Sequence, residues 1–77
     1  MELNNSGQSS TYHIRVKETL DHQFADWSGE LAIQPQENGE TLLEMSFPDQ
    51  SALRGFLDQL LNLNITIISV ERIENEL

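Results

Sequence analysis

The chain has 77 residues, enough for one domain, and its 13 acidic against four basic side chains give a formal net charge of −9. The affinity of a protein for nucleic acid depends mainly on neutralising phosphates, so this negative charge excludes DNA and RNA as partners. The same charge predicts repulsion from anionic membranes, whereas a basic protein remains a possible partner. The chain has no Cys, which excludes a disulfide scaffold and a thiolate metal site.

We expect residues 1–10 to form a disordered tail, residues 11–74 a single domain and residues 75–77 a frayed end. A domain of this size buries only about 60% of the surface of its unfolded chain, so self-association is favoured. No apolar run approaches the roughly 20 residues that cross a bilayer, and the start has neither the positive charge nor the apolar core of a secretory signal. These features predict a cytoplasmic protein.

Residues 11–17 alternate in polarity and predict a strand, with one face formed by Tyr12, Ile14 and Val16. Residues 18–26 follow, where three side chains are spaced like one side of a short helix: Leu20, Phe24 and Trp27. Whether residues 20–27 form a helix or a loop stays open. A second strand is expected over residues 28–34, with Leu31 and Ile33 pointing inward.

Asn38-Gly39 is a strong hairpin signal, because both residues tolerate the left-handed backbone that tight hairpins need. The turn joins residues 28–34 to a third strand over residues 41–47. In that strand we expect Leu43, Met45 and Phe47 to face inward.

A long helix is expected over residues 50–62, capped by Asp49 and ended by Asn64 in the left-handed conformation. Its inward stripe at i, i+3, i+4 and i+7 consists of Leu53, Phe56, Leu57 and Leu60. Gly55 lies off this stripe and either allows a close approach of another backbone or is neutral. The β-branched residues 65–70 predict a last strand, with Ile68 and Val70 facing inward.

The order of elements predicts an α+β fold: a four-stranded antiparallel sheet with one main helix and a short helical segment, ferredoxin-like or a near variant. The alternative is a three-stranded meander followed by a helix and a strand. The glycines of the sequence do not cluster between a strand and a helix start, so neither arrangement contains a phosphate-binding loop. The sequence indicates no cofactor.

His13 is the candidate acid–base residue, with Glu44 on a neighbouring strand as its partner. The simpler interpretation makes Glu44 the ion-pair partner of Arg15. The one close group of metal-ligand types is Asp21, His22 and Asp26, which we interpret as an exposed helix start and not as a metal site. We therefore expect neither a catalytic residue nor a bound metal.

Two binding surfaces are expected. Phe24 and Trp27, with Phe56 of the long helix, are either a plug of the core or the lining of a small-molecule pocket. The second surface, for self-association, is the sheet face away from the helix. Side chains alternate between the two faces of a strand, and this alternation places polar and apolar residues together on that face: His13, Arg15, Leu42, Ile67 and Ile73. The edge of the last strand is uncharged over residues 65–70 and is expected to pair or be covered.

Three stretches of the chain carry a resemblance: Leu20-Asp21 with residues 24–31, residues 48–57 and residues 63–72. They resemble a family of small uncharacterised bacterial proteins with the patterns Leu-Asp…Asp-Trp-x-Gly-x-Leu and Pro-Asp-Gln-x-Ala-Leu-x-Gly-x-Leu. The resemblance implies a bacterial origin and a shared compact domain, with no known activity. The chain departs from that pattern at Ser28, Arg54 and Asn64, so no functional residue transfers.

The sequence thus favours a non-catalytic interaction or regulatory module that acts as a homodimer. Two alternatives remain: a small-molecule-sensing domain with a pocket near Phe24, Trp27 and Phe56, and a small dimeric enzyme that uses His13 and Glu44.

Overall fold

Four strands and one long helix make up the computed structural model, which describes residues 9–20 and 31–73. The strands are β1 (Ser10–Val16), β2 (Ala32–Pro35), β3 (Thr41–Phe47) and β4 (Ile67–Ile73), and the helix is α2 (Gln50–Asn62). The short helical segment expected at residues 18–26 falls largely outside the described residues. So does the start of the second predicted strand.

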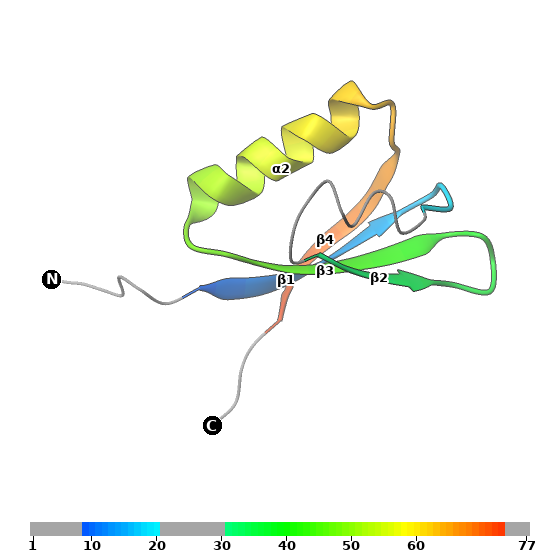
Figure 1. The fold of residues 1–77 in the computed structure, drawn as a ribbon, viewed down its shortest axis with the longest axis horizontal. Helices are drawn as coiled ribbons and strands as arrows, with labels where there is room; N and C mark the ends of the chain where they lie inside the picture. The colour runs from blue at the N-terminus through cyan, green and yellow to red at the C-terminus, as the bar shows by residue number, and fades with distance from the viewer. Residues whose placement is uncertain (1–8, 21–30, 74–77) are drawn as a thin grey trace, which may run out of the picture.

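The strands form one antiparallel sheet in the order β2-β3-β1-β4. Because β3 and β4 are both antiparallel to β1, they are parallel to each other, and α2 makes the connection between them across one face of the sheet (Figure 1). The α+β class and the four-stranded antiparallel sheet are confirmed. The arrangement is compatible with a ferredoxin-like variant.

The turn before β3 follows the hairpin prediction. Gly39 has a φ of +89°, in the left-handed region, and the N–H of Gln36 donates to the carbonyl of Glu40 at 2.9 Å. Thr41 then begins β3 fully buried, and its hydroxyl satisfies two backbone groups of the chain that follows β1. Its Oγ1 donates to the carbonyl of Glu18 at 2.8 Å and accepts from the N–H of Leu20 at 3.0 Å.

Helix α2 has the two ends that its sequence predicts. At the start, Asp49 Oδ1 accepts a hydrogen bond from the N–H of Ala52 at 2.9 Å. At the other end, Asn64 has a φ of +63°, and the N–H groups of Asn64 and Ile65 donate to the carbonyls of Leu61 and Leu60. This pair of bonds is a Schellman motif, in which Ile65 packs back on the helix.

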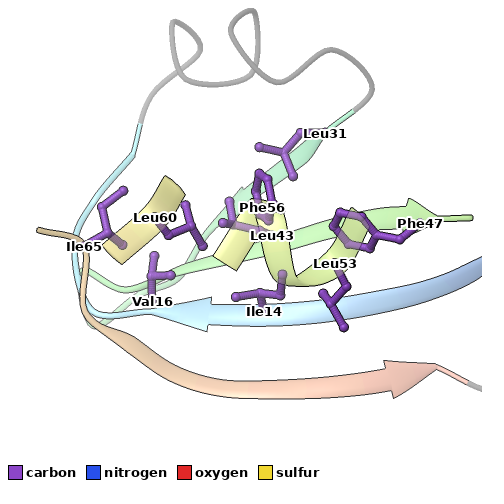
Figure 2. Packing of buried hydrophobic residues seen from close by; sticks show 9 residues of the cluster. All are labelled: Ile14, Val16, Leu31, Leu43, Phe47, Leu53, Phe56, Leu60 and Ile65. Carbon is purple, nitrogen blue, oxygen red and sulfur yellow. The ribbon is translucent and has the colours of Figure 1, made fainter. Parts of the chain in front are cut away.

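The core lies between α2 and the sheet (Figure 2). From the helix come Leu53, Phe56 and Leu60, whereas Leu57 of the predicted stripe is only partly buried. The sheet side is led by Ile14 and Leu43, both fully buried, and the remaining members are Val16, Leu31, Phe47 and Ile65. Phe47 contacts Phe56 with a ring-centre distance of 5.6 Å.

The last strand differs from its prediction in position and in orientation. β4 spans Ile67–Ile73, and Ile65, expected to begin the strand, is instead a buried residue of the helix-ending turn. The register between β1 and β4 shifts at Arg15 and Val16, since Arg15 pairs with Ser69 and Val16 with Ile67. Ile68 is therefore an extra residue, and such a bulge reverses the parity of the residues before it.

The bulge makes the prediction about the side-chain direction of Ile67 wrong. Ile67 pairs with the buried Val16 and packs against the core, so it does not belong to the face away from the helix. Ile68, expected to point inward, is 46% exposed. Val70 does share the core face, because it pairs with Ile14, yet it remains 41% exposed at the sheet edge.

Leu60 and Leu61 are neighbours in α2 and provide a matched test of this packing, because Leu60 is fully buried and Leu61 is 56% exposed. Leu60→Ala should lower the free energy of unfolding by about 2–5 kcal/mol, through lost transfer energy and a cavity. Leu61→Ala should change it by no more than about 0.5 kcal/mol. Urea unfolding followed by circular dichroism measures both, and equal losses would contradict the described core.

Candidate functional site

The sheet face opposite α2, here called the open face, is covered by no helix or strand of the described chain. Cross-strand pairs in an antiparallel sheet point to the same side, so the registers identify the members of this face. Three rows run across the strands: Gln34, Leu42, Arg15 and Ser69; Ala32, Glu44, His13 and Glu71; and Ser46, Thr11 and Ile73.

His13 lies between two carboxylates in the middle row. Its Nε2 atom is 3.3 Å from Glu44 Oε1, and Glu71 is its partner on the other side, in β4. The predicted pairing of His13 with Glu44 is thus present in the structure. The simpler expectation that Glu44 pairs with Arg15 is wrong, because Arg15 lies opposite Leu42 and instead places Nη1 3.5 Å from Glu40 Oε1.

A histidine and a carboxylate become an acid–base pair only when a reacting group lies within their reach. The hydroxyls nearest in the register lie one row away: Ser69 on one side and, on the other, Thr11 and Ser46, which bond to each other at 2.7 Å. Both His13 and Glu44 are partly exposed, so their contact is a surface interaction worth under about 1 kcal/mol. Among residues 9–20 and 31–73, no group of three His, Cys, Asp or Glu side chains is placed to hold a metal ion.

Of the five residues expected to support self-association, four share the open face: His13, Arg15, Leu42 and Ile73. Ile67 lies on the other side, as the bulge requires. The two apolar members, Leu42 and Ile73, are separated by the row that contains Glu44, His13 and Glu71. The open face is therefore more polar than the sequence pattern indicates.

The two edges of the sheet differ in how they are protected. β2 has only four residues and ends at Pro35, which lacks a backbone N–H. β4 has seven residues, and its outer side pairs with no other strand of the described chain. Four large apolar residues of the described chain are exposed: Leu61 in the last turn of α2, Leu63 just after it, and Ile68 and Val70 on β4. The helical stripe in the sequence does not include Leu61, and no periodic pattern singles out Leu63.

Glu18, which the sequence analysis did not single out, holds the chain entering β4. Its Oε1 accepts a hydrogen bond from the N–H of Thr66 at 2.8 Å, and the N–H of Lys17 donates to the carbonyl of Thr66 at 2.9 Å. The bond from the Thr66 N–H holds the pKa of Glu18 below its ordinary value of 4.5. The start of the edge strand is thereby tied to the end of β1.

The expected small-molecule pocket is described only at Phe56, since Phe24 and Trp27 lie outside the described residues. Phe56 is a core residue, and part of it lines a shallow groove of about 410 Å³ between the end of β3 and α2. Gly55 also lines the groove, and a Cβ added there would meet no atom within 4 Å. Within residues 9–20 and 31–73, no backbone lies within 4 Å of such a Cβ.

Comparison with protein families gives one assignment. Residues 11–71 match the model of a domain of unknown function, DUF8691, which covers most of the chain. The chain belongs to this family. No curated protein and no solved structure matches the chain. In this DUF8691 domain, no described helix is long and apolar enough to cross a membrane.

Acid titration tests the contact at Glu18. Because the folded-state pKa lies below the ordinary value, the bond adds stability above about pH 4.5, and that contribution is lost as the pH falls through the folded-state pKa. The difference in unfolding free energy between wild type and Glu18→Gln should therefore shrink between pH 7 and pH 3. Urea unfolding across this range measures it. Glu37→Gln, which removes a carboxylate from an exposed turn, is the control for the loss of one negative charge.

Proposed function

We propose that this chain is a non-catalytic interaction module that acts as a homodimer in the bacterial cytoplasm. The observation that carries the proposal is β4, a seven-residue edge strand whose outer side is unpaired in the described chain. Unpaired strand edges of this length are normally blocked by charge, by Pro or by another strand. The resemblance to small bacterial proteins and the lack of Cys support the origin and the compartment.

Exposed apolar side chains support the same proposal. Val70 and Ile68 lie on β4 itself and are 41% and 46% exposed, and Leu61 and Leu63 at the end of α2 are more than half exposed. Burying apolar surface stabilises association by roughly 25 cal/mol for each Å² removed from water. A second copy that covers this edge gains from both backbone pairing and apolar burial.

The chemistry of the open face supports a module without catalysis. His13 has a carboxylate partner but no hydroxyl or other nucleophile in its row, and two of the three hydroxyls in the neighbouring rows, those of Thr11 and Ser46, are bonded to each other. An enzyme that uses His13 and Glu44 would lose its activity in His13→Ala. A binding module would keep its fold and its oligomeric state in that variant.

Light scattering at micromolar concentration tests the homodimer. The wild-type mass should be twice the 8.8 kDa of one chain. Val70→Lys should shift the mass to that of the monomer, because a charge on an edge strand opposes pairing with another strand. Leu42→Lys on the open face is the matched control and should leave the dimer intact. A wild-type monomer would overturn the proposal.

A second candidate, the small-molecule sensor, rests on the groove of about 410 Å³ with Phe56 in its wall. Its lining combines apolar side chains such as Met45 and Phe47 with polar ones, Ser46 and Gln59, which suits a small ligand with both apolar and polar groups. Trp27 is the single tryptophan of the chain, so quenching of its fluorescence across a panel of metabolites measures binding. Gly55→Leu should fill the groove and abolish any quenching that originates there, whereas Arg54→Leu, on the neighbouring exposed position, should not.

A further inference from the structure

We infer that two copies of the chain pair through antiparallel β4 strands, with a two-fold axis at Val70, and form one continuous eight-stranded sheet. This inference rests on the proposed homodimer and specifies its surface and its register. The partner is a second copy of this chain, and the surface is the outer edge of Ile67–Ile73.

The choice of β4 follows from a comparison of the two edge strands of the sheet. β2 offers four residues and a terminal Pro, so it provides few backbone groups for a partner. β4 offers seven residues, five of them uncharged: Ile67, Ile68, Ser69, Val70 and Ile73. Main-chain hydrogen bonds along a strand of this length are the usual source of affinity in strand addition.

Pairing through the open face is disfavoured by its charges. Glu44 and Glu71 flank His13 in the central row, between the only two large apolar side chains of that face. Stacking two such faces would bring carboxylates of two chains together, and each chain already carries a net charge of −9. Edge pairing keeps the open faces side by side and solvated.

Symmetry then restricts the register. A two-fold axis perpendicular to the sheet keeps each side chain on its own face, so opposing residues must point to the same side. The axis therefore passes through a residue of β4 and not between two residues. A centre at Val70, the midpoint of the strand, aligns the residues from Ile68 to Arg72, whereas a centre at Ser69 aligns only three. Ile67 and Ile73 stay outside the paired stretch, because the bulge places Ile67 on the core face and Ile73 lies on the open face.

Charge selects the same centre. An axis at Glu71 or Arg72 would place that residue opposite its own copy, and like charges directly opposite each other are destabilising. With the axis at Val70, Glu71 lies opposite Ser69 of the partner subunit, and Arg72 lies opposite Ile68 of the partner subunit. Val70 meets Val70 of the partner subunit on the core face, where it is 41% exposed in the single chain.

Cysteine cross-linking tests this register cleanly, because the chain has no Cys of its own. Directly opposite residues in antiparallel strands have Cα atoms about 4.5–5.5 Å apart, a separation that suits a disulfide. Under mild oxidation Val70→Cys should become mostly covalent dimer on a non-reducing gel. Ser69→Cys and Glu71→Cys should each cross-link slowly alone, and the double variant should cross-link rapidly. Ala32→Cys on β2 is the control and should stay monomeric on the gel.

The outcomes separate this inference from the proposal on which it rests. A wild-type dimer in light scattering that fails to cross-link at Val70→Cys, or that cross-links better at Glu71→Cys or Ala32→Cys, overturns the β4 register and leaves the homodimer standing. A wild-type monomer overturns both. If Val70→Cys loses its helical circular dichroism, the double variant at positions 69 and 71 decides the register by itself.

Discussion

In residues 9–20 and 31–73, one helix covers one face of a four-stranded sheet, and the helix is narrower than the sheet. This difference in width leaves the β4 edge of the core face exposed. An α-helix with its side chains is about 10–12 Å wide, whereas four strands at a spacing of about 4.8 Å extend over roughly 14 Å between the outer strand axes. Leu53, Phe56 and Leu60 therefore seal the centre of the sheet over Ile14 and Leu43. Val70 shares the core face but lies at the edge, and it stays partly exposed.

The polar contacts near β4 fix the strand in spite of this incomplete cover. The Schellman motif places Ile65 in the core. Glu18 and Lys17 form hydrogen bonds with Thr66, the residue just before β4. The bulge at Ile68 points the side chain of Ile67 toward the core. The strand is therefore ordered along its inner side by β1, while its outer side pairs with no other strand of the described chain. An ordered edge lowers the entropic cost of adding another strand, because its backbone is already extended.

Local signals explain which parts of the fold could be predicted from the sequence. Asp49, Asn64 and the Asn38-Gly39 pair act through hydrogen bonds and backbone angles within a few residues, and they place the ends of α2 and the turn before β3 correctly. The face of Ile67 and the partner of Arg15 depend on how β1 pairs with distant strands. A one-residue bulge reverses the face of Ile67, and the register between strands decides the partner of Arg15. The alternation of residue types within a single strand therefore cannot reveal either feature.

The candidate site could be predicted only in part for the same reason. Strand parity correctly places His13, Arg15, Leu42 and Ile73 on one face, but cross-strand register creates the row in which Glu44 and Glu71 flank His13. That row makes the open face a polar surface and leaves β4 as the apolar one. In an edge-paired dimer of the proposed register, the two β1 strands would lie three strand spacings apart, about 14 Å. The row of His13 would then continue into the row of the partner's Arg15, because Glu71 would lie opposite Ser69 of the partner subunit. Such pairing would extend the open face without covering it.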